Sequence, residues 1–199
     1  MPRLLFATPS PYSAKVRMAA THVGIAFEAV PVATAEDPKL LTDANPLGKI
    51  PVFITDEGEA VYDSRVITQY LNRISGNRLF PRNAAKRLEA EKLEAMSDGL
   101  CDCLIAIIYE HRMRPTEMVY QPWVDRQWAK AERVLTVLNE SPPKLPKTIS
   151  AGHIALRAAI GYLAIRFEAK WEKRWPRLES WAARFDEKFP MLAALTPKA

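Results

Sequence analysis

The sequence predicts an α/β domain built on a four-stranded mixed sheet, followed by an all-helical domain. Three observations carry this prediction. Short apolar runs alternate with a helical pattern over roughly the first 75 residues, strand patterns then disappear, and about 30 residues of continuous helical periodicity follow. Alternating strands and helices are typical of an α/β domain, whereas amphipathic helices alone bury their apolar faces against one another.

The chain begins with a predicted β-α-β unit. Residues 4–7 form an apolar run typical of a buried strand, and the helix that follows ends at Gly24. Its apolar face consists of Val16, Ala19, Ala20 and Val23. The next strand, residues 27–32, contains Pro31, which has no amide N–H for a neighbouring strand. We therefore expect this strand at the edge of the sheet.

A hairpin and a third helix complete the first domain. After a short helical stretch, residues 51–55 and 60–62 predict two strands joined by a turn that contains Gly58. The third helix is capped by Asp63 or Ser64 and carries a row of apolar side chains. This row consists of Ile67, Tyr70, Leu71 and Ile74. The mixed sheet with its helices resembles a thioredoxin-like domain.

The second domain is predicted to contain helices only. We place the first domain at residues 1–76, a linker at 77–83 and the helical domain at 84–199. From about residue 83 to 113, apolar residues recur every three or four positions until Pro115 stops the helix. A helix of about 30 residues is long for a globular protein, and it can line the cleft between two domains.

Composition indicates a globular protein of ordinary character, with 48% hydrophobic and 26% charged residues. The longest apolar stretch, residues 104–108, is far shorter than the roughly 20 residues that cross a bilayer. The N-terminus leads straight into a strand instead of a signal peptide, which predicts a cytoplasmic location. The net charge is +5, but bases and acids are interspersed, so we expect neither a nucleic-acid partner nor a membrane partner.

The spacing of the two cysteines favours a packing role over a redox or metal-binding role. Cys101 and Cys103 are two residues apart and lie on different sides of a helix, so they do not form a Cys-x-x-Cys redox pair. A metal site needs more ligands than these two thiols supply. We therefore expect no metal here.

Three short signals outline a binding site for a small thiol peptide. Ser10, after the first strand, stands where a helix N-terminus exposes unpaired amides and favours an anion such as a thiolate. Pro51 opens the third strand and is a candidate cis proline, which would leave the backbone of Ile50 free to pair with a peptide. Asp63 and Ser64 stand at the start of the third helix.

The order and spacing of these residues resemble the glutathione transferase family, in its bacterial branches with serine at the active-site position. Three further stretches extend the resemblance over nearly the whole chain. They are residues 45–51, the step 114–115 followed by Trp123, and residues 150–155 continuing into 161–163. Together they are fairly specific for the fold and less specific for one activity.

The resemblance implies glutathione as co-substrate, with Ser10 donating a hydrogen bond to its thiolate. A plain helix cap is the other interpretation of Ser10, and Ser13, one helical turn on, is the second candidate donor. Asp63 and Ser64 match the pair that holds the γ-glutamyl end of glutathione, the ammonium and the carboxylate respectively. Lys49 is a candidate partner for the glycyl carboxylate or a solvated lysine.

The second substrate is expected against the long helix. By the resemblance, Tyr109, Arg112 and Arg114 form a polar and aromatic end there, with Tyr12 approaching from the first domain. Tyr109 and Arg112 are three residues apart and share a helix face. Arg112 favours anionic or strongly polarised electrophiles, but a surface position or an interdomain ion pair also fits an arginine there.

The sixth helix departs from the family pattern at His153, three residues after its cap Ser150. The family usually has an acidic residue there, which completes a capping box. A neutral imidazole can accept the same hydrogen bond from the amide of the cap, whereas a charged one at a helix N-terminus is unfavourable. We therefore expect stability to fall as His153 becomes protonated.

The sequence thus predicts a glutathione transferase acting on an electrophilic carbon, a disulfide or a peroxide. Serine at position 10 disfavours glutaredoxin-like chemistry, in which a protein cysteine forms a mixed disulfide. The resemblance also implies a detoxifying role and a homodimer. The alternative is a non-catalytic regulatory protein of the stringent starvation protein A type, which binds RNA polymerase on the same fold. An isomerase or dehalogenase is a further option on this scaffold.

Overall fold

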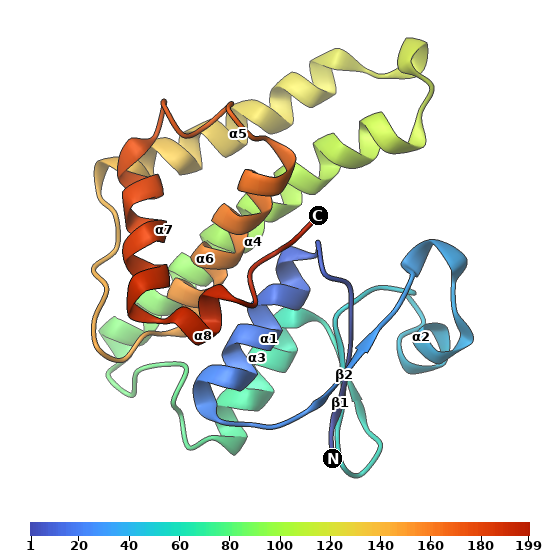
Figure 1. Ribbon diagram of the computed structural model, residues 1–199, viewed down its shortest axis with the longest axis vertical. Coiled ribbons are helices and arrows are strands. Elements are labelled where there is room, and N and C mark those ends of the chain that lie inside the picture. The colour runs from blue at the N-terminus through green and yellow to red at the C-terminus, as the bar shows by residue number, and fades with distance from the viewer.

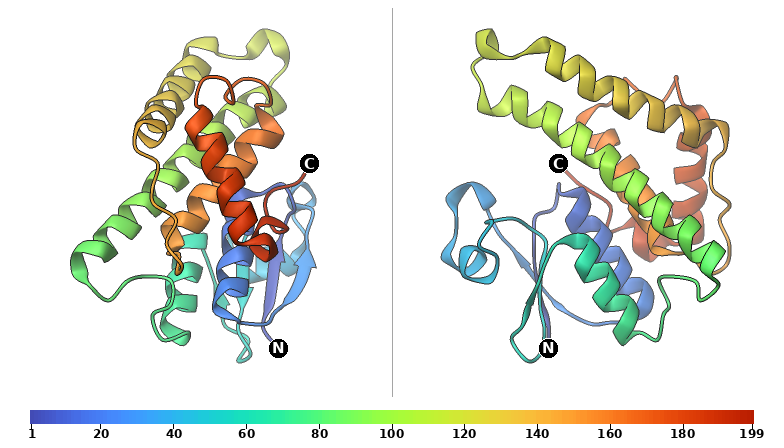
Figure 2. Two further views of the ribbon diagram at one scale, coloured as in Figure 1. Left: turned by 60° about the vertical axis from the view of Figure 1, so that its left-hand side comes forward. Right: turned by 180° about the vertical axis from the view of Figure 1, so that it is seen from behind.

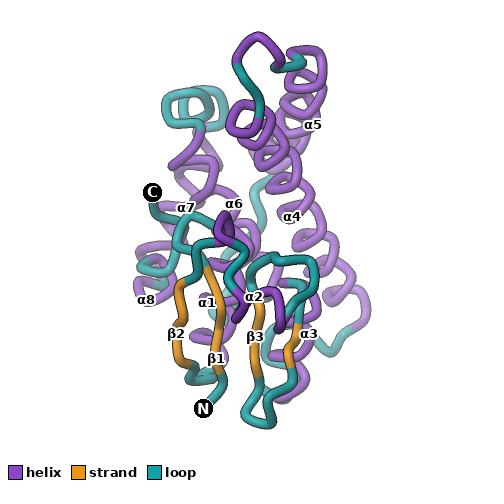
Figure 3. The backbone as a smooth tube through the Cα atoms, turned by 90° about the vertical axis from the view of Figure 1, so that its right-hand side faces the viewer, coloured by secondary structure: helices purple, strands orange, loops and turns teal.

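The computed structural model describes all residues from Met1 to Ala199 and shows a small sheet beside a group of helices (Figure 1). Four strands form one sheet in the order β2-β1-β3-β4 (Figure 3). They are β1 (Arg3–Phe6), β2 (Glu28–Pro31), β3 (Val52–Ile54) and β4 (Ala60–Val61). β1 and β2 are parallel, whereas the β1–β3 and β3–β4 pairs are antiparallel. The predicted four-stranded mixed sheet is therefore confirmed.

The edge position of β2 is also confirmed. Pro31 pairs in register with Phe6, at the end of β2. Because β1 lies between β2 and β3, its successive residues are buried on both faces of the sheet. Leu4 belongs to the large core shared with the helices, and Leu5 packs in a smaller cluster with Leu41.

The helices of the α/β part cover the two faces of this sheet. They are α1 (Pro11–Val23), α2 (Lys39–Ala44) and α3 (Ser64–Ile74), and a 3-10 turn, η1 (Thr34–Glu36), precedes α2. α1 buries the apolar face predicted for it and ends at Gly24, whose positive φ of 76° suits a residue without a side chain. α3 includes the whole predicted apolar row, of which Ile67 and Leu71 are buried, whereas Ile74, the last residue of the helix, is 52% exposed.

The helical part contains the predicted long helix. Its elements are α4 (Ala84–Met113), η2 (Thr116–Met118), α5 (Gln121–Glu140), α6 (Ala151–Arg166), α7 (Pro176–Lys188) and α8 (Pro190–Ala193). α4 has 30 residues and is capped by the Asn83 side chain, which accepts from the amide of Lys86 at 3.1 Å. α6 is buried on nearly all sides and packs against both α4 and α1 (Figure 2, right).

The two parts share one continuous apolar core, which includes residues of α1 and α3 as well as α4 to α7. The division at residues 77–83 therefore remains a proposal based on the sequence. The C-terminal tail returns to the α/β part, where the amide of Lys198 lies 3.3 Å from the carbonyl oxygen of Thr8. None of the helices combines the length and the apolar character needed to span a bilayer.

Candidate functional site

A cavity of about 650 Å³ lies between the α/β part and helices α4 and α6. All nine residues that the sequence analysis assigned to a site are among its 23 lining residues. They are Ser10, Tyr12, Lys49, Ile50, Pro51, Asp63, Ser64, Tyr109 and Arg112. The fold therefore gathers into one place residues drawn from both parts of the chain.

Ser10 is positioned by the turn between β1 and α1. It is the N-cap of α1, and its Oγ accepts a hydrogen bond from the amide of Ser13 at 3.2 Å. A hydroxyl can accept and donate at the same time, so the Ser10 proton is free for an anion in the cavity. Ser13 is completely buried and does not line the cavity. Of the two serines considered as donors, only Ser10 reaches this space.

The corner before β3 presents a free stretch of backbone. The Ile50–Pro51 peptide bond is cis, as the sequence analysis expected. Neither the N–H nor the C=O of Ile50 forms a hydrogen bond within the chain. The corner is held by the buried side chain of Asn45, which donates to the Lys49 carbonyl at 2.8 Å and accepts from the Leu47 amide at 3.1 Å. The backbone of Ile50 can therefore pair with an extended ligand.

The start of α3 offers one hydroxyl and one carboxylate oxygen. Asp63 is the N-cap, and a single oxygen, Oδ1, accepts from the amides of Arg65 at 3.0 Å and Val66 at 3.4 Å. Its other oxygen has no partner within the chain. Ser64 is the first residue of the helix, and its hydroxyl also forms no hydrogen bond within the chain. Both side chains can cap the helix or line the site and still bind a ligand.

A buried group of charges lies beside the cavity, and the sequence analysis missed it. Lys15 is 1% exposed, and its Nζ lies 2.8 Å from Asp98 and 3.2 Å from Glu94. Arg65 contacts the same Asp98 oxygen at 2.9 Å. Burial raises the pKa of Glu94, and the charge of Lys15 opposes that change. These contacts join α1, α3 and α4 at the cavity, which Arg65 and Asp98 line.

The phenol of Tyr12 is already engaged. Its hydroxyl donates to the Asp102 carboxylate of α4. Burial raises the pKa of Tyr12, and the hydrogen bond to Asp102 acts in the same direction. The phenol therefore stays protonated, and its O–H donates a hydrogen bond to Asp102. Ser10, at the start of α1, also lines this cavity.

The C-terminal halves of α4 and α6 form the remaining wall. The Arg112 guanidinium carbon lies 6.0 Å from the centre of the Tyr109 ring. Arg114, which the sequence analysis grouped with them, instead pairs with Glu110 at 2.9 Å and does not line the cavity. Tyr162 and Arg166 of α6 do line it and were not foreseen. This wall is consequently both aromatic and basic.

Comparison with known proteins agrees with this geometry. Residues 9–74 match the model of the glutathione S-transferase N-terminal domain. The chain is 30% identical to the uncharacterized GST-like protein YibF of Escherichia coli K12 over 168 residues, which cover 82% of this chain and 83% of the relative. The chain belongs to the glutathione S-transferase family.

Solved structures of other members of this family carry ligands. A glutathione S-transferase of Methylobacillus flagellatus KT, crystallised with glutathione, is 32% identical over the full length of both chains, with a TM-score of 0.90. A family member from Pseudomonas fluorescens Pf-5 is 31% identical over the full length of both chains and has a TM-score of 0.89. That protein was crystallised with glutathione and also with S-(propanoic acid)-glutathione.

The helix cap expected at His153 is present in this GST-family chain, away from the cavity. The amide of Ser150 donates to His153 Nδ1 at 3.1 Å, and Nε2 lies 2.9 Å from the Lys144 carbonyl oxygen. The imidazole thus replaces the usual acidic side chain as acceptor. Burial lowers the pKa of His153, and the bond to the Lys144 carbonyl opposes that change.

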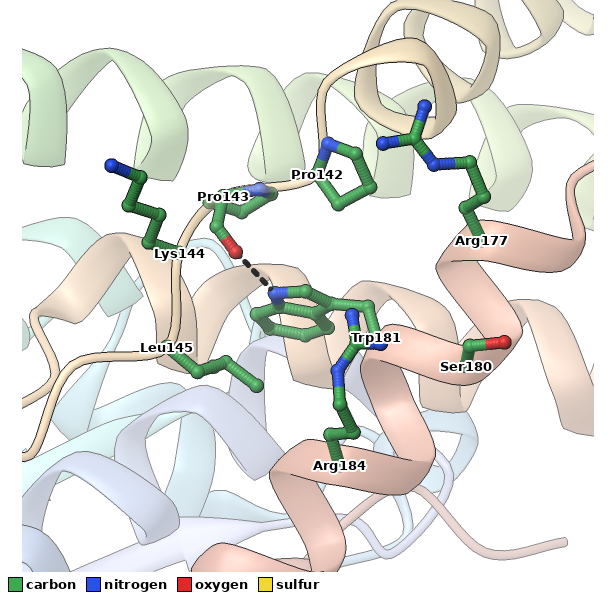
Figure 4. A pocket seen from close by; sticks show the side chains of 8 residues that line it. All are labelled: Pro142, Pro143, Lys144, Leu145, Arg177, Ser180, Trp181 and Arg184. Atoms are coloured by element: carbon green, nitrogen blue, oxygen red, sulfur yellow. Dashed lines mark hydrogen bonds between the residues drawn. The ribbon is translucent and has the colours of Figure 1, made fainter.

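A second hollow of this GST-family protein, about 380 Å³, lies between the loop after α5 and helix α7 (Figure 4). Two of its polar side chains already form hydrogen bonds within the fold. The indole N–H of Trp181 donates to the Pro143 carbonyl at 2.7 Å, and Arg177 donates to the Glu140 carbonyl at 2.6 Å. None of the residues assigned to the site borders this hollow.

The cysteines lie in α4 and are both free thiols. Cys101 is buried and Cys103 is half-buried, and burial raises the pKa of both thiols. Neither lines the cavity. No group of three or more His, Cys, Asp or Glu side chains is arranged to share a metal ion.

Proposed function

We propose that this GST-family protein is a glutathione transferase, which binds glutathione and directs its thiolate at an electrophilic carbon, a disulfide or a peroxide. The position of Ser10 carries the proposal, because its hydroxyl lies on the cavity wall at the N-terminus of α1 with its proton unused. The competing donors are disfavoured, since Tyr12 is bonded to Asp102 and Ser13 is buried.

The cavity provides a partner for each part of glutathione. The γ-glutamyl carboxylate accepts from the Ser64 hydroxyl at the positive end of α3, and its ammonium binds the free oxygen of Asp63. The backbone of Ile50, next to Pro51, pairs with the cysteinyl residue. Lys49 binds the glycyl carboxylate. Glutathione bound to relatives about 30% identical supports this assignment.

A modest stabilisation of the thiolate is enough to ionise bound glutathione. A free thiol has a pKa near 8.5, and each unit of decrease requires about 1.4 kcal/mol of preference for the thiolate. A hydrogen bond to a charged group is worth about 1.5 to 3 kcal/mol, and a helix N-terminus adds about 0.3 to 1 kcal/mol. Together they lower the pKa by one to three units, roughly, and a decrease of about two units leaves glutathione largely ionised at neutral pH.

The relatives also bear on the type of reaction. The Pseudomonas protein was crystallised with a thioether of glutathione, which has the form of a conjugation product. This favours attack on carbon over reduction of a disulfide or peroxide. We further propose a cytoplasmic homodimer with a role in detoxification and without nucleic-acid or membrane partners. Size-exclusion chromatography with light scattering tests the dimer.

The decisive experiment compares wild type with Ser10→Ala and, as the matched control, Ser13→Ala. Wild type should bind immobilised glutathione and conjugate a chloro-nitroaromatic electrophile. Ser10→Ala should reduce turnover at least tenfold, roughly, because the loss of a hydrogen bond to a charged group raises the pKa of the bound thiol. The ultraviolet absorbance of the thiolate, measured against pH in the glutathione complex, reports that pKa directly.

Two outcomes would contradict the proposal. An unchanged thiolate titration in Ser10→Ala would reject Ser10 as the donor. Absence of both glutathione binding and turnover in wild type would instead favour a regulatory protein of the stringent starvation protein A type. A pull-down with RNA polymerase would then be the next measurement.

A further inference from the structure

Two arginines on the cavity wall have no acidic partner. Arg112 lies on α4 and Arg166 on the last turn of α6, and neither forms a salt bridge. The Arg112 guanidinium lies over the ring of Tyr109 and forms no hydrogen bond within the chain. The Nε of Arg166 is fully buried and still makes no hydrogen bond. A buried donor without a partner is costly, and no acidic or carbonyl group of the chain satisfies this arginine.

Neighbouring arginines show that such pairing is available elsewhere in the same region. Arg65 at the same cavity contacts Asp98, and Arg114, two residues after Arg112, contacts Glu110. A residue such as Arg166 in the last turn of a helix also complements the helix dipole. That role, however, requires neither a buried Nε nor a place on the cavity wall.

The two unpaired arginines act on the same neighbourhood. Tyr162, from α6, lines the cavity with both of them and feels the charge of each. Burial raises the pKa of its phenol, and the positive charges of Arg166 and Arg112 oppose that change. Tyr109 also influences this phenol. The four side chains therefore form one basic and aromatic wall, which we call the arginine wall: Tyr109, Arg112, Tyr162 and Arg166.

The two acidic residues of α4 that line the cavity do not neutralise the arginine wall. Asp98 is engaged by Lys15 and Arg65, and Asp102 accepts the hydrogen bond of Tyr12. Asp102 stands ten residues before Arg112 on α4, which corresponds to about 15 Å along the helix axis. The charge along α4 thus changes from acidic beside the start of α1 to basic at its C-terminal end.

We propose that the arginine wall binds a carboxylate, so that the preferred second substrate is an aromatic electrophile that bears a carboxylate group. The guanidinium fork presents paired N–H donors that match the two oxygens of a carboxylate, and the tyrosine rings pack against the aromatic body. This inference rests on the proposed transferase function. In the reaction with an aryl chloride, the sulfur–carbon bond forms, the carbon–chlorine bond breaks, chloride leaves with the bonding electrons, and the thiol proton passes to solvent.

The test uses two glutathione conjugates that differ only in the carboxylate, S-benzylglutathione and S-(4-carboxybenzyl)glutathione. Their affinities for the full-length protein are measured by isothermal titration calorimetry at pH 7, where the carboxylate is ionised. Wild type should bind the carboxylated conjugate about tenfold more tightly, because charge-assisted hydrogen bonds are the strong ones. Raising the salt concentration should reduce this preference.

The variants assign the preference to residues. Arg166→Gln and Arg112→Gln should each remove most of the tenfold preference for the carboxylated conjugate over S-benzylglutathione. Arg166→Lys should restore part of it. Arg114→Gln is the matched control, because Arg114 lies two residues from Arg112 and is absent from the cavity wall; it should keep the full preference.

Equal affinity of wild type for the two conjugates would overturn the inference, as would a preference that survives both Arg166→Gln and Arg112→Gln. If Arg166→Gln fails to fold, Arg112→Gln at its exposed position decides alone. Failure of the transferase proposal looks different, because glutathione and both conjugates would then fail to bind wild type. Glutathione binding without a carboxylate preference rejects the arginine wall only.

Discussion

Lys15 is a charged residue in the interior, where isolated charges are unfavourable. It is 1% exposed and contacts two acidic side chains of α4, Glu94 and Asp98, while Arg65 contacts Asp98 from the other side. One cation and two acidic side chains are thus buried together, and the half-exposed Arg65 reaches them from the surface. Removing water from these ions costs several kcal/mol each, and only the close geometry offsets that cost. The group depends on each of its members.

Replacing Lys15 with methionine should therefore destabilise the protein strongly. Lys15→Met keeps the length of the side chain but leaves two buried carboxylates with one cation, so we expect the free energy of unfolding to fall by about 3 kcal/mol. Lys39→Met is the matched control, since Lys39 is 88% exposed and 3.9 Å from Asp43, and its effect should stay within about 0.5 kcal/mol. Urea denaturation measures both values. Equal midpoints for the two variants would contradict the argument.

The residues of the site divide into those that sequence could predict and those that it could not. Ser10, Pro51 and Asp63 stand in short motifs at the ends of strands and helices, where local sequence determines local structure. Lys15 gave no such signal, because a lysine within an apolar helix face commonly extends its amine to water. Its partners are about 80 residues away, and only the folded chain brings them together.

At the scale of the element, α6 shows how a helix start can depend on pH. The backbone amide of Ser150 donates a hydrogen bond to Nδ1 of His153. The other ring nitrogen, Nε2, lies 2.9 Å from the Lys144 carbonyl oxygen. The first bond requires a neutral Nδ1. A proton on this nitrogen would remove the acceptor and place a positive charge at the positive end of the helix. The cap is therefore strongest when the imidazole is neutral.

The contribution of His153 to stability should disappear in mild acid. Burial lowers its pKa in the folded protein, so the stabilisation is complete above the unfolded value of about 6.5 and is lost as the pH falls through the folded value. His153→Ala should be less stable than wild type by about 1 kcal/mol at pH 7.5, and this difference should shrink at pH 5.5. Thermal unfolding measures it.

The control separates this effect from the other histidines. His22 also has a pKa lowered by burial, but it is present in both proteins and cancels in the comparison. His111→Ala is the matched variant, because His111 is exposed and takes no part in this cap; it should keep the stabilisation that His153 provides at pH 7.5. A wild-type advantage over His153→Ala that does not change between pH 7.5 and 5.5 would refute the cap as described.

The sequence predicted the element boundaries closely, but it did not predict how far burial extends along a helix. The long helix begins after Asn83 and ends at Met113 before Pro115, as the periodicity and the proline predicted. Ile74 continued the apolar row of α3 and is nevertheless exposed. Periodicity indicates which face of a helix can be buried, but the length of the neighbouring elements decides how far along the helix burial continues.

At the scale of the whole molecule, the close contact of α4 with α6 holds the helical part together. Gly152 makes this contact possible. A Cβ at position 152 would lie 2.6 Å from the carbonyl oxygen of Ala90 and 2.9 Å from the Cβ of Leu93. Both atoms belong to the fixed part of α4, so a side chain cannot be accommodated by a simple rotation. The same helix pair also carries the arginine wall.

Gly152→Ala should therefore destabilise the protein although alanine favours helices. We expect a loss of about 1 to 3 kcal/mol in the free energy of unfolding, since α4 and α6 must move apart. Gly99→Ala is the control, because Gly99 is helical and nothing lies within 4 Å of its Cβ position. That change should be neutral or stabilising by up to about 1 kcal/mol. A Gly152→Ala variant as stable as Gly99→Ala would disprove the close approach.

The position of Arg166 illustrates what global structure adds. In the sequence it is a basic residue at the end of an apolar helix, which the helix dipole alone explains. Only the packing of α6 beside α4 places Arg166 on the wall of the cavity that Ser10 also lines, although Ser10 is 156 positions earlier in the chain. No local sequence pattern predicts that Arg166 and Ser10 line the same cavity.

The outer strands of the sheet have a consequence for behaviour at high concentration. An unprotected edge strand can pair with the edge of another molecule and begin an ordered aggregate. Here β4 is only two residues long, and β2 carries Glu28 and ends in Pro31, which offers no donor. Neither edge strand can act as a template for a β-sheet that extends from one molecule to the next. Concentrated solutions should accordingly remain free of cross-β fibrils.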